Sequence, residues 1–225
     1  MMIELPYYAV VLCGGKGTRL VERLSPGVPK CMADVGTTVA GVTFIEFLMT
    51  ELVRLGVRSF ILCIGHGQEA IRRHVFESPG HSFNPKRQVL RISFSEDPEP
   101  LGTAPALLRA LPLVRSNPFL LVNGDTYCPG VDLEMAFEHH REARLSSRES
   151  LVVTLLTDNQ DRHCGLAVCQ LSLGAYLHNH INVEEAFSVL WRKRGMLVTF
   201  PACERFYDIG SPKGLEEFKR LCLSY

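Results

Sequence analysis

Short apolar runs alternate along this chain with stretches whose apolar residues recur at helical spacing. The run at residues 59–64 has the length and the Ile/Leu content of a buried strand. In the stretch before it, Phe44, Leu48 and Leu52 fall on one helical face, and Gly56 follows where a left-handed cap is expected. Because this alternation is the signature of βαβ units, we expect a Rossmann-like, doubly wound α/β fold with a mixed, mostly parallel sheet flanked by helices.

The same pattern gives approximate bounds for the elements. Strands are predicted at residues 7–13, 59–64, 89–94, 119–123, 151–156, 166–171 and 196–200. Helices are predicted at residues 44–55, 68–75, 103–110, 132–140, 183–193 and 212–223. The last helix has Ser211 to cap its first turn and Pro212 for its first position. Residues 77–87 and 141–149 are polar without periodicity and are predicted to be surface loops.

Length and charge narrow the class of protein. The chain has 225 residues, a length that single α/β domains reach, so we expect one domain over residues 1–225. Hydrophobic residues make up 46% of it, enough for a sizeable core. Lys+Arg and Asp+Glu balance at 24 each, so the chain lacks the positive surplus that follows a nucleic-acid backbone. We therefore expect no nucleic-acid partner, and any bound phosphate should be small and held by a few donors and a metal.

The eight cysteines include no Cys-x-x-Cys pair, and several lie within apolar runs. This favours reduced, buried thiols, with a zinc site or a disulfide framework as the alternative. The first residues lack the features of a signal peptide, and no apolar run approaches the about 18 residues of a membrane span. We expect a cytoplasmic protein without a membrane partner. A homo-oligomer is compatible with the pattern, since interface stripes and core stripes have the same spacing.

The most informative segment is residues 10–20, where a buried strand breaks into a turn containing Gly14, Gly15 and Gly17. Glycines let backbone N–H groups come close to a phosphate. The spacing is not that of a Walker A loop, and a dinucleotide fingerprint would require glycine where Leu20 stands. We therefore predict a different kind of phosphate cradle, with a purely structural turn as the alternative.

Further motifs follow this turn in a definite order. They are Gly-x-Gly-Thr-Arg-Leu at residues 15–20, Pro-Lys at 29–30, Leu-Gly-Thr-Ala at 101–104, Asn-Gly-Asp at 123–125 and Asp-Ile-Gly at 208–210. Their order and spacing resemble the sugar-1-phosphate nucleotidyltransferases. Within that family, residues 123–127 and 206–212 are most similar to the D-glycero-D-manno-heptose 1-phosphate guanylyltransferases.

The resemblance implies a fold of the nucleotide-diphospho-sugar transferase type and an enzyme that uses Mg²⁺. It would transfer GMP from GTP to D-glycero-D-manno-heptose 1-phosphate, or another nucleoside monophosphate to another sugar 1-phosphate, and release pyrophosphate. The NTP and the sugar phosphate would be its small-molecule partners. The nucleotide-binding part would cover residues 1–127 and the sugar-binding part residues 128–225.

The chemistry of this transfer accounts for the charged residues in the motifs. A sugar 1-phosphate is already an anionic nucleophile, so attack on the α-phosphorus requires charge neutralisation and in-line alignment. We expect Arg19 to grip the β- and γ-phosphates with its planar fork, and Lys30 to neutralise the α-phosphate and the sugar phosphate. Asp125 ends a buried strand, where ligands bind in open α/β sheets. Arg19, Lys30 and Asp125 are thus the predicted catalytic residues.

The metal and the nucleotide complete the predicted site. The resemblance assigns Mg²⁺ to Asp125 and Asp208, whose oxygens suit a hard cation. Glu99 is expected to accept from N1–H and N2–H₂ of guanine, a pattern that uracil and thymine lack, while a solvated loop glutamate is the alternative. The predicted nucleotide-binding residues are Leu12, Cys13, Gly14, Gly15, Lys16, Gly17, Thr18, Arg19, Glu99, Gly102, Thr103 and Asp125.

The sugar half departs from the family pattern. The Glu-Lys pair and the Asn-Ala-Gly segment that relatives use to hold the sugar phosphate are missing after residues 165–171. Asn123 and Gly165 remain as predicted sugar-binding positions. Three readings therefore stay open: an active enzyme with a compact acceptor site, a CTP- or UTP-dependent enzyme acting on another sugar phosphate or a phospho-alcohol, and an inactive NTP-binding regulatory module.

Overall fold

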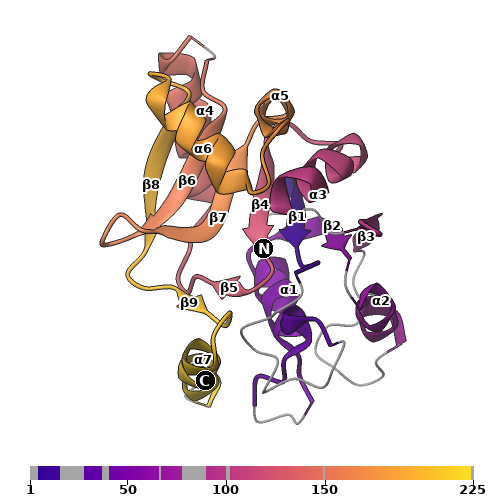
Figure 1. Cartoon of the computed structure of the whole chain (residues 1–225). Helices are drawn as coiled ribbons and strands as arrows, with labels where there is room; N and C mark the ends of the chain where they lie inside the picture. Colours follow the sequence, from indigo (N-terminus) through magenta and orange to yellow (C-terminus); the bar gives the residue numbers. More distant parts are fainter. Residues whose placement is uncertain are drawn as a thin grey trace.

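A mixed sheet forms the centre of the computed structural model, which describes residues 5–15, 28–36, 41–65, 67–77, 90–99, 102–148 and 150–223. Its strand order is β3-β2-β1-β4-β7-β6-β8 (Figure 1). The strands are β1 Leu5–Leu12, β2 Val57–Ile64, β3 Arg91–Glu96, β4 Phe119–Asn123, β6 Val153–Asp158, β7 His163–Cys169 and β8 Leu197–Cys203. A separate small sheet pairs β5 (Thr126–Tyr127) with β9 (Tyr207–Asp208).

The pairing makes the sheet mixed and mostly parallel, as predicted. Strands β1 to β4 run parallel to one another, β7 runs antiparallel to both β4 and β6, and β8 is parallel to β6. The chain passes from β1 to β2 and β3 on one side and then returns to place β4 on the other side of β1. Such a reversal leaves a crevice at the carboxyl ends of the strands, where open α/β sheets bind ligands.

Helices cover both faces of the sheet. Neighbouring strand residues point to opposite faces, and both faces carry apolar side chains that the helices bury. Val11 of β1 belongs to the core under α1 (Phe44–Arg54), α2 (Gln68–Glu77), α4 (Leu133–Ser146) and α7 (Pro212–Cys222). Val10 belongs to the core under α3 (Thr103–Ala110), α5 (Gly174–Leu177) and α6 (Val183–Arg192), which lie together on one side of the sheet in Figure 1. The short 3₁₀ helices are η2 Lys30–Met32, η3 Leu111–Leu113 and η4 Leu171–Leu173.

Several predicted bounds need correction. The loop predicted at residues 141–149 is helical as far as Ser146, because α4 continues to that residue. The buried side chains of α4 end at His140, and none of residues 141–146 is buried, so this last part of the helix has no apolar spacing to mark it. The strand predicted at 166–171 begins at His163 and ends at Cys169, after which the chain turns into η4. The predicted loop at 77–87 begins with the last residue of α2, and its remainder lies outside the described residues.

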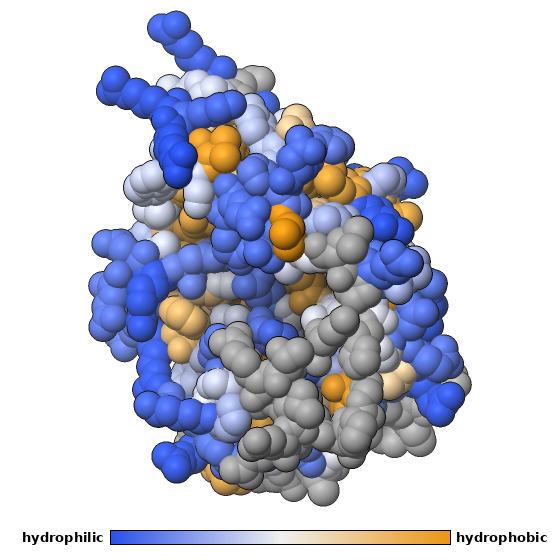
Figure 2. Space-filling view, in the orientation of Figure 1, coloured by the Kyte–Doolittle hydropathy of each residue, from blue (hydrophilic) through white to orange (hydrophobic). Residues whose placement is uncertain are grey.

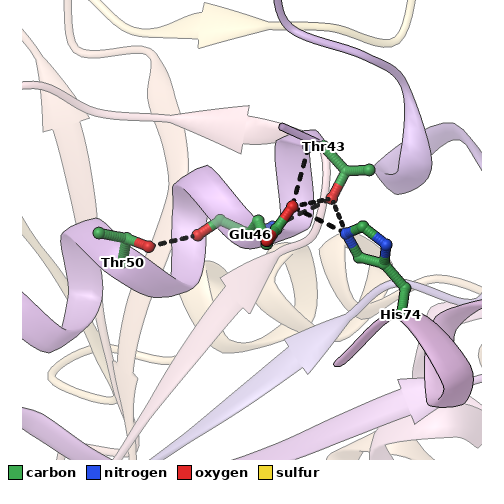
Figure 3. Close-up of polar contacts among 4 residues, drawn as sticks. All are labelled: Thr43, Glu46, Thr50 and His74. Atoms are coloured by element: carbon green, nitrogen blue, oxygen red, sulfur yellow. Dashed lines mark hydrogen bonds and ion pairs between the residues drawn. The ribbon is translucent and has the colours of Figure 1, made fainter. Parts of the chain in front are cut away.

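The start of α1 is fixed by a polar cluster that also holds α2 (Figure 3). Thr43 and Glu46 form a reciprocal capping box, in which the Thr43 amide donates to Glu46 Oε2 at 3.2 Å. His74 of α2 places Nε2 2.8 Å from Glu46 Oε2 and 2.9 Å from Thr43 Oγ1. The Phe44 amide donates to the Ala33 carbonyl at 2.9 Å. These contacts anchor the segment that carries Lys30 to the helix layer.

A second buried polar cluster joins α4 to the sheet through a neutral histidine. Gln170 Nε2 donates to His140 Nε2 at 2.7 Å, so His140 Nδ1–H is left to donate to Thr154 Oγ1 at 2.9 Å. Burial, with smaller contributions from Arg144 and His139, lowers the pKa of His140 to about 4. The native state therefore holds this imidazole uncharged under conditions where the unfolded chain protonates it.

This histidine makes unfolding pH-dependent. Between pH about 6.5, the usual pKa of histidine, and about 4, the unfolded state binds the extra proton, so stability falls as the pH falls. The shift corresponds to about 3 kcal/mol across that window. Urea unfolding at a series of pH values should show a shallower slope for His140→Gln than for the wild type. The exposed His178→Gln is the control, and equal slopes for His140→Gln and the wild type would contradict the assignment.

The surface seen in Figure 2 is largely hydrophilic, and its apolar colours fall in small separate patches. Large apolar side chains are exposed at Met135, Leu145, Ile181, Trp191 and Leu223. Isolated residues of this kind are usual on monomeric proteins. These exposed residues do not define an interface, so homo-oligomerisation stays a prediction. Within the described residues, no helix combines the length and the apolar character that crossing a bilayer requires.

Candidate active site

A pocket of about 480 Å³ lies at the carboxyl ends of the parallel strands, where the strand order reverses. This volume is in the range of small-molecule sites, about 300–1,000 Å³. Its walls come from the ends of β1, β2 and β4, the segment after β3, and the starts of α3 and α6. The lining residues are Leu12, Gly14, Gly15, Lys30, Cys63, Ile64, Gly65, Asp97, Gly102, Thr103, Ala106, Asn123, Asp125, Asn182 and Glu184.

Gly14, in the turn after β1, and Gly124, after β4, are both packed closely against neighbouring backbone. A Cβ at Gly14 would lie 3.0 Å from the Gly65 amide nitrogen. Gly124 donates its amide to the Leu12 carbonyl at 3.0 Å, and a Cβ there would lie 2.7 Å from that oxygen. The Asn-Gly-Asp motif thus rests directly on the glycine turn. Lys16, Gly17, Thr18 and Arg19, which complete the predicted turn, lie outside the described residues.

Lys30 and Asp125 form an ion pair inside the pocket. Lys30 opens η2, and Asp125 follows β4, so their charges meet from segments far apart in the sequence. Their side chains are 22% and 18% exposed, which leaves both accessible to a ligand. A Cβ at Gly15 would lie 3.5 Å from Lys30 Cε, so the lysine passes beside the glycine turn. Two residues of the predicted catalytic set are therefore together.

Asp208 is brought next to Asp125 by the small β5–β9 sheet. Thr126 pairs with Asp208, and the Ile209 amide donates to the Asp125 carbonyl at 2.9 Å. Asp208 is exposed, does not line the pocket, and accepts from the Gly210 amide through Oδ1 at 2.6 Å. Two carboxylates on adjoining backbone segments fit the oxygen preference of Mg²⁺. Since Asp125 Oδ2 contacts Lys30, a cation there would have to share or replace that lysine.

Comparison with known proteins decides the family. The sequence model of the nucleotidyl transferase family matches residues 8–169. The chain belongs to this family. It is 32% identical over 119 residues to the D-glycero-alpha-D-manno-heptose 1-phosphate guanylyltransferase of Campylobacter jejuni, an alignment covering 53% of this chain and 48% of that protein. It is 35% identical over 136 residues to the mannose-1-phosphate guanyltransferase beta-B of Xenopus laevis, covering 59% and 35%.

The chain thus spans about half or less of the length of these curated relatives. A crystal structure titled HddC from Yersinia pseudotuberculosis complexed with GMP-PN superposes with a TM-score of 0.71 at 23% identity. That comparison covers 96% of this chain and 99% of the other. The nucleotide-diphospho-sugar transferase type of fold that the motifs implied is therefore confirmed.

The predicted base-binding residues of this family member are only partly in the pocket. Leu12, Gly14, Gly102 and Thr103 line it. Cys13 is buried beneath the turn, where its Sγ–H donates to the Cys63 carbonyl at 3.2 Å. Glu99, in contrast, is exposed and does not line the pocket.

Asp97, rather than the predicted Glu99, is the acidic residue of this segment that lines the pocket. It is 5% exposed, and neither carboxylate oxygen has a hydrogen-bond partner among the described residues. Arg109 Nη2 lies 3.3 Å from Oδ1, as an ion pair without hydrogen-bond geometry. A buried carboxylate with unused acceptors is costly unless a ligand supplies donors. The strand before it extends to Glu96, two residues beyond the predicted end, and neither this nor the burial of Asp97 was evident from the sequence.

Cys63 also lines the pocket, and its thiol is unreactive. Burial, reinforced by the negative charge of Asp97, raises the pKa of the Cys63 thiol to about 12. The hydrogen bond with Cys31, together with burial, raises the pKa of Cys13 well above its usual value. A thiol is nucleophilic as its thiolate. Both cysteines therefore serve packing rather than covalent catalysis near neutral pH.

Asn182 and Glu184 are pocket residues that the sequence did not indicate. The start of α6 docks on the start of α3, where Ala104 N donates to the Ile181 carbonyl at 3.1 Å and Val183 N donates to Thr103 Oγ1 at 3.0 Å. Gly102 permits this approach, since a Cβ there would lie 2.1 Å from the Ile181 oxygen. No local pattern in the sequence marks such a docking between distant segments.

The two predicted sugar-binding positions differ in their surroundings. Asn123 ends β4 and lines the pocket. Gly165 has φ 79°, and a Cβ there would lie 2.7 Å from Thr126 Cβ. The close approach of β7 to β5 therefore accounts for this glycine without a ligand, and its contact with a sugar stays a prediction.

Proposed function

We propose that this chain is a Mg²⁺-dependent guanylyltransferase that moves GMP from GTP to a sugar 1-phosphate and releases pyrophosphate. The acceptor that the relatives favour is D-glycero-D-manno-heptose 1-phosphate, because a curated relative that is 32% identical carries that activity in its name. The observation that carries the proposal is the pocket, in which a glycine turn, the Lys30–Asp125 pair and the buried Asp97 carboxylate converge.

The charges of the pocket suit a reaction between two anions. Lys30 lies between the glycine turn and Asp125, where it can neutralise the α-phosphate and the incoming sugar phosphate. Asp125 and Asp208 would hold Mg²⁺, which would supply further charge neutralisation when bound. Binding of the triphosphate would loosen the Lys30–Asp125 pair and redirect the ammonium group to phosphate oxygens. Lys30 and Asp125 therefore pair with each other without substrate and would each contact a different group when substrate is bound.

Asp97 replaces Glu99 as the residue that we propose reads the base. Guanine presents N1–H and N2–H₂ as adjacent donors on one edge, and a carboxylate accepts both. Uracil and thymine offer one ring N–H there. Because both Asp97 oxygens are buried without hydrogen bonds, a base lacking these donors would leave them unsatisfied. Guanine would satisfy them and be selected.

This role predicts a separation between activity and stability for Asp97→Asn. The change removes a charge-assisted contact of about 1.5–3 kcal/mol, so kcat/KM for GTP should fall about 10- to 100-fold. Stability should change little, since asparagine loses the ion pair with Arg109 but also removes a buried carboxylate charge that lacks hydrogen bonds. Steady-state pyrophosphate release and thermal unfolding measure the two effects. Glu99→Gln is the matched control, expected to keep near wild-type kinetics because Glu99 is exposed.

If Asp97→Asn kept the wild-type preference for GTP, the proposal that Asp97 recognises the base would be wrong. Lower stability together with unchanged kinetics would give it a structural role instead.

Asn182 and Glu184 extend the proposal to the acceptor. They reach the pocket from the shortened part of the chain and offer an amide and a carboxylate, which suit sugar hydroxyl groups. They would take over contacts that the missing Glu-Lys and Asn-Ala-Gly motifs make in relatives.

A donor and acceptor panel tests the whole proposal. Each NTP is incubated with Mg²⁺ and with each of several sugar 1-phosphates and phospho-alcohols, and pyrophosphate is measured. We expect GTP with the heptose 1-phosphate to react fastest. Preference for UTP or dTTP would overturn the guanine assignment, and turnover with a phospho-alcohol would overturn the sugar assignment. Thermal stabilisation by NTPs without pyrophosphate from any acceptor would instead indicate a binding module.

A further inference from the structure

Three cysteine thiols from separate parts of the sequence meet beside the small β5–β9 sheet. Cys128 follows β5, Cys164 lies in β7 and Cys203 ends β8. Their Sγ atoms all lie within 4.8 Å of one another. Cys128 and Cys164 are 4% and 0% exposed, whereas Cys203 is half-buried. The sequence contains no Cys-x-x-Cys pair, so the chain fold alone creates this cluster.

We propose that this cluster is a binding site for one thiophilic cation, with Zn²⁺ as the expected ion. Thiolates are preferred ligands of Zn²⁺ and Cu(I). With Zn–S bonds of about 2.3 Å, sulfurs of a tetrahedral site lie roughly 3.8 Å apart, so small side-chain movements would complete three bonds. The site differs in chemistry and position from the carboxylates proposed for Mg²⁺, and it does not depend on the proposed function.

The fourth coordination position would belong to solvent. Asp158 pairs with Cys203 across β6 and β8 and is the neighbouring carboxylate. Its Oδ2 already accepts from Arg162 Nε and Nη2 at 2.8 and 2.6 Å, and its Oδ1 accepts from the Gln160 and Arg162 amides. Cys203 is the accessible thiol of the three and provides the route of entry. A water molecule at that side would complete the coordination shell.

A cation here would clamp the segments that carry both predicted metal-binding aspartates. Cys128 lies shortly after Asp125, and Cys203 lies shortly before Asp208. Cys164 is adjacent to Gly165, which packs against Thr126. Bonds from all three sulfurs to one ion would hold β5, β7 and the β8–β9 connection together. We therefore assign the site a structural role, in which the bound cation stabilises the β5–β9 pairing.

The test uses the full-length chain in excess Mg²⁺, so that hard-ion sites do not compete. Zn²⁺ is titrated against a chromophoric chelator under reducing conditions, and Co²⁺ is added separately to record thiolate-to-metal charge-transfer absorption. We expect one tight equivalent of Zn²⁺, a charge-transfer band with Co²⁺ and a higher melting temperature with Zn²⁺. Cys203→Ala and Cys164→Ala should each lower the Zn²⁺ affinity by about 100-fold or more and abolish the band.

Cys222→Ala is the matched control, since Cys222 is buried at the end of α7 outside the cluster. It should retain the bound equivalent and the band. Cys203→Ala removes the most exposed ligand, and its circular dichroism without metal shows whether it folds. Wild-type protein without tight binding, equal binding by Cys203→Ala, or a disulfide between two of the three cysteines under the same conditions would overturn the proposal. Copper in place of zinc in the purified protein would support it.

Discussion

Lys30→Ala is expected to lower kcat/KM for pyrophosphate release by about 10²-fold or more. The ammonium group is the described cation that lies between the glycine turn and Asp125, where two anionic substrates must approach each other. Removing one preorganised charge of this kind raises a barrier by about 2.7–4 kcal/mol. The expected loss is in the reaction rather than in folding, because a partly exposed ion pair contributes little to stability.

The comparison requires a lysine of the same charge away from the pocket. Lys213 in α7 has a side chain that is 89% exposed, so Lys213→Ala changes the net charge equally without touching the site. Its kinetics should match the wild type. Lys30→Arg tests geometry, since it keeps the charge but replaces a compact ammonium by a planar fork. If kcat/KM of Lys30→Ala stayed at the wild-type value, the assignment of Lys30 to the phosphates would be lost.

Local patterns were sufficient to predict the strands of the main sheet and to single out Lys30 and Asp125, which line one pocket. Apolar runs bounded by turns located the main strands, and the position of a residue directly after such a run predicted where it would lie. Lys30 and Asp125 come from motifs separated by most of the nucleotide half, yet they form an ion pair. For Asp125, which follows β4, the physical basis is that the carboxyl ends of parallel strands share one edge of the sheet.

The choice between Asp97 and Glu99 could not be made from the sequence. Both are acidic residues in the same short segment, and hydrogen-bonding chemistry allows either to recognise guanine. They differ in burial, since Asp97 is only 5% exposed whereas Glu99 is exposed to solvent. Burial depends on how the segment after β3 crosses the sheet edge, where the Asp97 amide donates to the Ile64 carbonyl at 2.8 Å. Such a long-range contact leaves no local periodicity.

The acceptor side was the least predictable part for the same reason. Missing motifs indicated that this part is shortened, but they did not indicate what replaces the lost contacts. The residues that we propose as the replacement, Asn182 and Glu184, reach the pocket through the docking of α6 on α3. The cysteine cluster is a similar case, since Cys128, Cys164 and Cys203 come from separate segments that meet in the folded chain. Sites assembled from distant segments become visible once the topology is known.

Asp125→Asn should have the largest effect of the changes considered, a loss of about 10³-fold in turnover. Asparagine keeps the shape and an Oδ1 acceptor for the Thr126 hydroxyl, which donates to Asp125 at 3.3 Å. It loses the negative charge that would hold Mg²⁺ beside Asp208. Charge stabilisation of several kcal/mol by a bound cation corresponds to a rate factor of this size. Folding should be nearly unchanged, because the side chain is isosteric.

Magnesium dependence separates a lost metal ligand from a lost ion pair. If Asp125 binds the cation, Asp125→Asn should need a higher Mg²⁺ concentration for half-maximal rate, and Asp208→Asn should shift in the same direction. If Asp125 merely holds Lys30, the rate should fall without a change in the Mg²⁺ requirement. Asp34→Asn is the control, since this exposed carboxylate accepts from the Gly36 amide and asparagine keeps that bond. Near wild-type turnover in Asp125→Asn would contradict the metal role, because no isosteric amide replaces a carboxylate as a ligand of a hard divalent cation without loss of affinity.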